Sequence, residues 1–142
     1  MDQLDGLLME LVRVSGLLHM PDNRLPMSQA FALHELDLAD VLSQRDLAER
    51  LNLEKSTVSR LVAELERKEF VVRERDPDNR RFYRVRITPS GRSEHRRFAH
   101  EMHERYVTYL RGMSKSEQMA LRTGLAGLVR SMHHLADHEH IR

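Results

Sequence analysis

The stretch that decides the fold covers residues 42–91 and reads LSQRDLAERLNLEKSTVSRLVAELERKEFVVRERDPDNRRFYRVRITPSG. Ser43 and Asp46 have the spacing of an N-cap and an acidic third residue, so they predict the start of a short helix. After a turn at residues 51–53, a second helix is expected over residues 55–68. One apolar stripe with helical spacing runs along it: Val58, Leu61, Val62 and Leu65.

The other faces of the second helix carry small hydroxyl groups beside long cations: Lys55, Ser56, Thr57, Ser59 and Arg60. Hydroxyl groups can bond to base edges or phosphates, and Lys and Arg can reach guanine or the backbone. Two helices joined by a tight turn, with such residues on the second, are typical of a helix-turn-helix that enters a major groove of DNA. We add Ser43 and Gln44, at the start of the first helix, to the expected contacts. The alternative is an ordinary solvated helix face.

A basic hairpin follows directly. Residues 70–75 predict a strand, residues 76–79 a Pro-containing turn, and residues 81–88 a returning strand whose side chains alternate between two faces. Four of its arginines and the first acid of its turn join the predicted DNA contacts: Arg75, Asp76, Arg80, Arg81 and Arg84. An arginine at a hairpin tip can enter a minor groove. The alternative is a surface hairpin whose arginines pair with Asp76 and Asp78, and both hold if Asp76 braces Arg80 or Arg81 for DNA.

These segments resemble the MarR family, the multiple-antibiotic-resistance type of transcriptional regulator. The resemblance rests on STVSRLV at residues 56–62, LE at 65–66, RDPDNRR at 75–81 and ITPSG at 87–91, and it covers nearly the whole chain in order. It implies a winged helix-turn-helix that regulates transcription as a dimer. One departure concerns the wing, where the family commonly has Asp-x-x-Asp-Arg-Arg. This chain has Asn79 at the second acid and Asp78 one place earlier, which leaves the family's Asp brace in doubt here.

Composition sets the broad class of protein. The 142 residues suit one domain, and 40% hydrophobic with 32% charged residues fits a soluble folded chain. No apolar run is long enough for a membrane span, and the N-terminus lacks a secretory signal pattern. The chain has no cysteine, which excludes disulfides and thiol-based sensing by its own residues. A cytoplasmic location is the default expectation.

The net charge of +1 hides an asymmetry. Residues 43–97 hold 15 Arg and Lys against 10 Asp and Glu, whereas the rest of the chain holds 8 against 12. The basic excess therefore falls on the helix-turn-helix and the hairpin. Its position, more than its size, indicates a phosphate-binding surface.

Helices are expected on both sides of this stretch. In front, apolar periodicity predicts one over residues 4–19 and another over 28–38, with Ser28 as N-cap and Phe31, Leu33 and Leu36 pointing inward. Behind, Thr88 followed by Pro89 predicts the start of a helix to about residue 111. A capping box of Ser114 and Glu117 then predicts a last helix to about residue 138.

The terminal helices carry wide apolar faces with little else to cover them. We expect a single domain over residues 1–142, with the DNA-binding lobe at 28–91 and dimerisation helices at 1–20 and 89–142. The alternative is a monomer whose terminal helices pack on one another. The fold class predicted is mainly α with a small β-wing. A two-fold dimer would present two recognition helices to a palindromic site.

The resemblance also implies a small ligand, often an anionic aromatic, between the DNA-binding lobe and the dimer helices. Lining candidates on that analogy are Arg13, His19, Arg24 and His34. A ligand-independent regulator is the alternative. Nine histidines raise the further alternative of zinc sensing, since His134 and His138 share a helix face and His100 and His103 lie three residues apart. No further ligands are fixed by spacing, so we predict no metal and no cofactor.

No phosphate-binding loop, nucleophile elbow, zinc-protease motif or dinucleotide turn is present, so we expect no enzyme. The predicted function is a homodimeric repressor that places residues 55–68 of each subunit in adjacent major grooves. Arg80, with Arg81 or Arg84 behind it, would reach the flanking minor groove. The remaining alternative is a winged-helix module for protein interaction, which the arginine-bearing hairpin disfavours.

Overall fold

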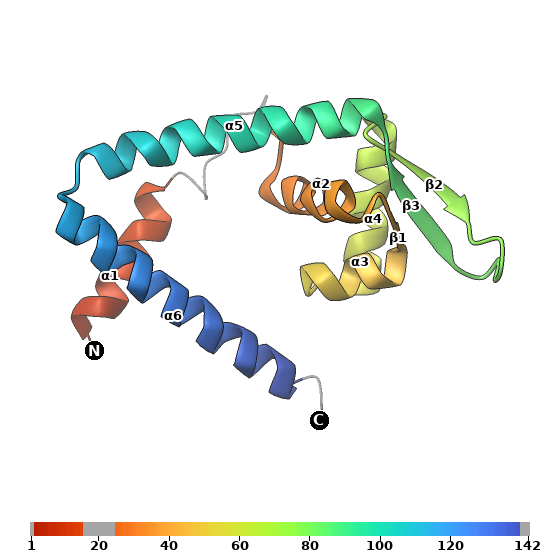
Figure 1. The fold of residues 1–142 in the computed structure, drawn as a ribbon. Helices are drawn as coiled ribbons and strands as arrows, with labels where there is room; N and C mark the ends of the chain where they lie inside the picture. Colours follow the sequence, from red (N-terminus) through yellow and green to blue (C-terminus); the bar gives the residue numbers. More distant parts are fainter. Residues whose placement is uncertain (1, 16–24, 140–142) are drawn as a thin grey trace. The chain divides into compact units, whose positions relative to one another are not determined.

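The computed structural model describes residues 2–15 and 25–139. In chain order the elements are α1 (Asp2–Val14), α2 (Met27–Ala39), β1 (Val41–Ser43), α3 (Gln44–Leu51), α4 (Lys55–Arg67), β2 (Val71–Arg75), β3 (Tyr83–Ile87), α5 (Pro89–Arg111) and α6 (Lys115–Glu139) (Figure 1). The predicted class, mainly α with a small β-wing, is confirmed. Among the described residues, no helix is both long and apolar enough to cross a bilayer.

Backbone contacts divide the chain into two compact units, Met1–Ala99 and His100–Arg142. Helix α5 belongs to both, since the boundary falls within its length. In the first unit, α2, α3 and α4 contact one another and the three-stranded sheet. In the second unit, the described residues are half-buried or exposed, including the large apolar side chains of α6.

The helix-turn-helix forms as predicted. Ser43 caps α3, because its Oγ accepts a hydrogen bond of 2.9 Å from the backbone N–H of Asp46. Asn52 ends that helix with φ of 52°, a left-handed conformation that Asn tolerates better than most residues. The predicted apolar stripe of α4 is buried: Val58, Leu61, Val62 and Leu65. This burial turns the polar faces of α4 away from the core.

The two helices in front of the helix-turn-helix differ from the prediction. Helix α1 is described only to Val14, and residues 16–24 of the predicted helix and loop lie outside the described residues. Helix α2 begins one residue earlier than expected, and Pro26, not Ser28, occupies its N-cap position without a side-chain bond. Leu33 and Leu36 are fully buried as predicted. Phe31 is 56% exposed, so its inward placement was wrong; the core on this helix is completed by alanines instead.

The sheet contains one strand that the sequence did not predict. Short β1 pairs antiparallel with β3, which lies at the centre of the order β1-β3-β2. Strand β2 begins at Val71, one residue later than expected, and pairs with β3 over its whole length. The predicted alternation on β3 is confirmed, because Val85 and Ile87 are buried and Arg84 and Arg86 lie on the other face.

At the junction of the hairpin with α5, two backbone segments lie very close together. Thr88 caps α5, since its Oγ1 accepts a hydrogen bond of 3.0 Å from the N–H of Gly91 and donates one of 2.7 Å to the carbonyl of Glu69. A Cβ added to Gly91 would lie 2.1 Å from the carbonyl oxygen of Phe70. Only glycine allows the backbone at Phe70 to pass so close to α5.

Polar contacts fasten the first turns of α5 to the end of α2. Arg92 donates a hydrogen bond of 2.6 Å to Asp37, and it also pairs with Asp40. His95 lies 3.2 Å from the second oxygen of Asp37 and 3.2 Å from His34. Partial burial alone would raise the pKa of Asp37, but the hydrogen bonds and charges of Arg92 and His95 together hold that pKa below its usual value.

The rear capping box is present. The N–H of Ser114 donates to Glu117 at 2.7 Å, and the N–H of Glu117 donates back to Ser114 Oγ at 3.2 Å. Hydrogen bonds of the Glu117 carboxylate with Ser114, the one from the backbone N–H first, lower the pKa of Glu117. The predicted end of the preceding helix at about residue 111 and the start of the last helix at this capping box are therefore confirmed.

We predict that Gly91→Ala destabilises the lobe by about 3 kcal/mol or more, because its new methyl group meets a backbone carbonyl that cannot move alone. Urea unfolding monitored by circular dichroism measures the free energy. The matched control is Gly6→Ala in α1, where a Cβ meets nothing within 4 Å. Equal stability of the two variants would contradict the close approach at Phe70.

We predict that Asp37→Asn lowers the free energy of unfolding near neutral pH by about 1.5–3 kcal/mol, through loss of charge-assisted hydrogen bonds. Because the native pKa of Asp37 is lowered, this stabilisation is present above the unfolded pKa of about 3.9 and is lost as pH falls through the native pKa. Urea titrations at several pH values should therefore show the gap to the parent protein closing in acid. Asp78→Asn is the control, since Asp78 is exposed. A gap that stays constant into strong acid would be inconsistent with this linkage.

Candidate nucleic-acid interface

The start of α4 presents the polar residues that the sequence singled out. Lys55, Ser56 and Arg60 are exposed, whereas Thr57 and Ser59 are half-buried. All five lie within the first two turns of α4, opposite the buried stripe. Among the described residues, neither Lys55 nor Arg60 forms an ion pair. Both cations are therefore free to bind an external anion.

The two residues predicted at the start of α3 have different environments. The Ser43 hydroxyl oxygen accepts the capping bond from Asp46, which leaves its O–H hydrogen able to donate to a phosphate. Gln44 is half-buried, and its Oε1 has no hydrogen-bond donor among the described residues. A buried acceptor without a donor is uncommon in folded proteins. Gln44 thus contributes an unused acceptor beside the start of α4.

Residues from three elements line a hollow on the lobe, which we call the basic hollow: Gln44, Arg45, Lys55, Arg81, Phe82 and Tyr83. They come from the start of α3, the start of α4 and the hairpin. Three are cations, and no acid lines the hollow. Their convergence joins the predicted helix and hairpin contacts in a single surface suited to a polyanion.

Sequence reasoning missed Arg45, Phe82 and Tyr83 as members of this surface. Arg45 had a usable signal, since it is an exposed cation in the first turn of α3, next to Gln44. Phe82 had another, because strand alternation sets this large aromatic on the same side as Arg84 and Arg86, and the structure leaves it 46% exposed. Tyr83 had none, since alternation sets it on the same side of β3 as Val85 and Ile87, which are buried.

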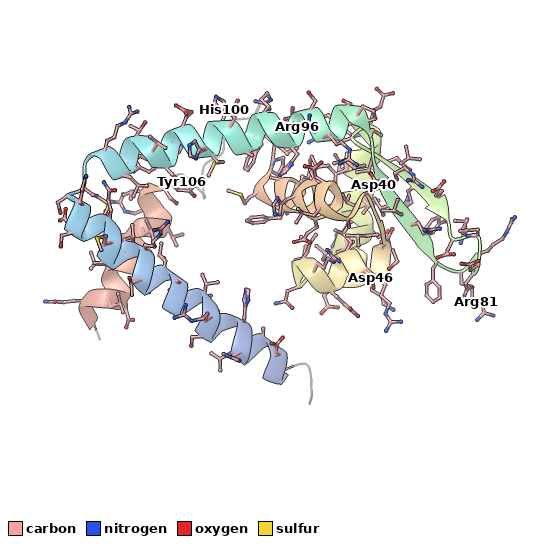
Figure 2. The ribbon with its side chains drawn as sticks, in the orientation of Figure 1. Asp40, Asp46, Arg81, Arg96, His100 and Tyr106 are labelled. Atoms are coloured by element: carbon pink, nitrogen blue, oxygen red, sulfur yellow. The ribbon has the colours of Figure 1, made fainter. Side chains whose placement is uncertain are left out.

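The hairpin divides its arginines between internal and external roles. Arg75 lies over the ring of Tyr83 at 4.3 Å and donates a hydrogen bond of 2.8 Å to the carbonyl of Arg80. These contacts order the hairpin from within. Arg80 and Arg81 are exposed, and Figure 2 places Arg81 near the tip of the hairpin. Arg84 is half-buried on β3, opposite Glu74 of β2.

Asp76 does not brace the wing arginines directly. Its carboxylate accepts a hydrogen bond of 2.8 Å from the N–H of Asp78, and its own N–H donates to the carbonyl of Phe82 at 2.9 Å. The Asn79 side chain accepts from the N–H of Arg81 at 3.2 Å. Within the described residues, no ion pair joins Asp76 or Asp78 to Arg80 or Arg81. The expected brace is replaced by bonds that shape the turn, so the guanidinium groups of Arg80 and Arg81 have no ion pair among the described residues.

The ligand-lining candidates do not gather in the part of the chain that is described. Arg13 pairs with Glu10 of its own helix, and this hydrogen bond raises the pKa of the Arg13 guanidinium. His34 contacts His95 of α5. His19 and Arg24 lie outside the described residues. Among residues 2–15 and 25–139, no group of three His, Asp or Glu side chains has the arrangement of a metal site.

Comparison with known proteins places this surface in a family. Residues 25–82 match the sequence profile of the MarR family. One relative is the uncharacterized HTH-type transcriptional regulator YdgJ of Bacillus subtilis. It is 38% identical over 71 residues, which are 45% of this chain and 43% of that protein. The chain spans about half the length of the curated relatives it matches, 43% and 54%.

Solved structures share the fold. The PcaV transcriptional regulator from Streptomyces coelicolor, in complex with its natural ligand, has a TM-score of 0.71 at 24% identity over 89% of this chain and 92% of that one. Streptococcus pneumoniae FabT in complex with DNA has a TM-score of 0.73 at 20% identity over 94% and 95%. YdgJ and PcaV are both named as transcriptional regulators, in agreement with the prediction that the chain is not an enzyme. Over residues 25–82, which carry the winged helix-turn-helix, this chain thus matches the MarR family.

Proposed function

We propose that this protein is a sequence-specific DNA-binding regulator of transcription that acts in the cytoplasm as a homodimer and represses by covering a palindromic operator. The observation that carries the proposal is the basic hollow, where Arg45, Lys55 and Arg81 converge from α3, α4 and the hairpin without an acid among them. A strand of DNA phosphates that passes between a major-groove helix and a minor-groove wing is the partner such a surface fits. FabT, of similar fold, has been solved with DNA.

In this mechanism, α4 enters the major groove by its first two turns. Ser56, Thr57 and Ser59 bond to bases or phosphates, and Arg60 reaches a guanine edge or the backbone. Arg80, at the hairpin tip, enters the flanking minor groove, where the potential is most negative. Arg75 supports this placement from inside the hairpin through its bond to the carbonyl of Arg80.

Dimerisation is supported by apolar surface that the described chain leaves uncovered. The exposed residues of α6 recur at helical spacing: Met119, Leu121, Leu125, Leu128, Val129, Met132 and Leu135. Helix α1 exposes a comparable set: Leu4, Leu7, Leu8, Met9, Leu11, Val12 and Val14. Soluble proteins seldom leave contiguous apolar faces of this length in water. A second copy, related by two-fold symmetry, would cover such faces and set two recognition helices side by side.

We also propose that a small-molecule effector regulates the binding of DNA. The PcaV regulator has been solved with its natural ligand, which supports a ligand that biases the spacing of the two DNA-binding lobes. His34 is the described candidate for contact with it, since its ring is exposed and lies against His95 between α2 and α5. Zinc sensing and a pure protein-interaction role draw no specific support from the described residues.

Selection of duplexes from a random-sequence pool tests the proposed function. We expect an enriched palindrome whose half-sites lie about one helical turn apart, bound by two chains, with affinity that falls steeply as salt rises. Analytical ultracentrifugation of the complex gives the stoichiometry. Failure to enrich any sequence at low and moderate salt would overturn sequence-specific binding, and a single chain on the duplex would overturn the dimer alone.

Arg80→Ala tests the wing. We expect operator affinity to weaken by about 1–3 kcal/mol, because the unpaired guanidinium group leaves the minor groove. The matched control is Arg67→Ala, which removes the same charge from the last turn of α4, about 18 Å along the helix from Lys55. Arg67 is held by Glu64 at 2.7 Å, so its removal should change affinity little. Equal losses of operator affinity in the two variants would mean that Arg80 contributes only its positive charge and makes no specific contact with DNA.

A further inference from the structure

A chain of opposite charges connects helix α5 with the strands of the wing. Arg92, in the first turn of α5, pairs with Asp37 at 2.6 Å and with Asp40. Asp40 also lies 3.7 Å from Arg86 on β3, and Arg86 lies 3.6 Å from Glu74 on β2. Asp40 is the branch point, because it is the residue that contacts both the arginine of α5 and the arginine of β3. Figure 2 shows Asp40 where α2, α5 and the sheet meet.

The backbone of Asp40 is fixed as firmly as its side chain. Its N–H donates to the carbonyl of Leu36 at 2.7 Å, which closes α2, and its carbonyl accepts from the N–H of Ile87 at 3.4 Å. Its φ of 68° is positive, which is uncommon for residues other than glycine and less so for Asp and Asn. Asp40 therefore joins the end of α2 to β3 through both backbone and carboxylate.

On the basis of the function proposed above, we propose that Asp40 is a positioning residue for the DNA-reading wing. Strand β3 carries Arg84 and leads back to Arg81 and Phe82 of the basic hollow. The hairpin rises about 3.3 Å per residue, so a tilt of about 10° at Arg86 would move residue 81 by about 3 Å. Such a shift is as large as a hydrogen bond is long. Holding Arg86 at the base of the hairpin thus holds the arginines at its tip.

The solvent exposure of these ion pairs favours a role in positioning the wing over a role in stabilising the fold. The Asp40 carboxylate is 60% exposed and the Arg86 side chain 48%, and exposed pairs add little to folding free energy. The sign of the charge is also informative. Asp40 is an acid in a basic lobe, so by charge alone its removal should strengthen binding to DNA. The positioning role predicts the opposite, and the two effects can therefore be separated.

Asp40→Asn is the test variant, because Asn tolerates a positive φ as Asp does and removes the charge. We expect the affinity for the selected operator to weaken about three- to tenfold, with an unchanged circular dichroism spectrum. The matched control is Glu69→Asn, which also removes one negative charge at a left-handed position, φ of 62°. We expect the control to bind as tightly as the parent protein or slightly more tightly. Asp40→Asn that binds equally or more tightly overturns the inference.

A double-variant cycle separates a positioning role from a general structural one. In a background of Arg80→Ala with Arg81→Ala, the wing contact is already lost, so Asp40→Asn should weaken binding by less than about twofold. The same fold-loss in both backgrounds would overturn the inference, as would a background that binds as tightly as the parent. A parent protein that selects no operator overturns the proposed function itself. A parent that binds normally while Asp40→Asn shows no loss overturns only the role of Asp40.

Discussion

The close passage of the Phe70 carbonyl over Gly91 is the constraint on which the rest of the lobe depends. It fixes where the hairpin leaves α4 and where β3 gives way to α5. Thr88 completes the junction, since its N–H donates to the same Phe70 carbonyl at 3.0 Å while its hydroxyl caps α5 and bonds to Glu69. The direction of the wing and the starting point of α5 are consequently set by one cluster of backbone contacts.

Charge pairing separates the structural cations of the lobe from those that face outward. Arg50 pairs with Glu35, Arg67 with Glu64 and Arg92 with Asp37, all within 3.0 Å. By contrast, no ion pair within the described residues neutralises the cations of the basic hollow that come from α4 and the hairpin tip. Neutralised cations stabilise the local fold, and unpaired ones on a concave surface concentrate positive potential there. The lobe is thus basic at one place, which a modest net charge does not reveal.

The sequence predicted correctly those elements that depend on interactions between residues close together in the chain. The cap at Ser43, the stripe on α4 and the Thr88 start of α5 each depend on residues a few positions apart, and each was confirmed. Strand β1 was missed because its three residues become a strand only through pairing with β3, more than forty positions away. Phe31 was misplaced because α2 is apolar on most sides, so periodicity does not identify its buried face.

The candidate site was predicted in part for the same reason. Lys55 and Arg81 belong to separate sequence motifs, and each motif was recognised by its own pattern. Their meeting with Arg45 and Phe82 in one hollow is a tertiary result. Tyr83 shows the limit most clearly, since alternation assigned it to the core side, whereas its ring supports Arg75 at 4.3 Å and lines the hollow.

Helix α5 gives the proposed regulation a physical route. It is continuous from Pro89 to Arg111 and so belongs both to the unit that carries the lobe and to the unit that follows it. Its first turns are tied to α2 by Arg92 and His95, and through Asp40 to the strand that leads to the wing. In the proposed mechanism, a ligand or a partner subunit that shifts α5 would therefore act on the same side chains that hold β3. Because these pairs are partly exposed and individually weak, we expect a shift of α5 to change the direction of the wing without unfolding the lobe.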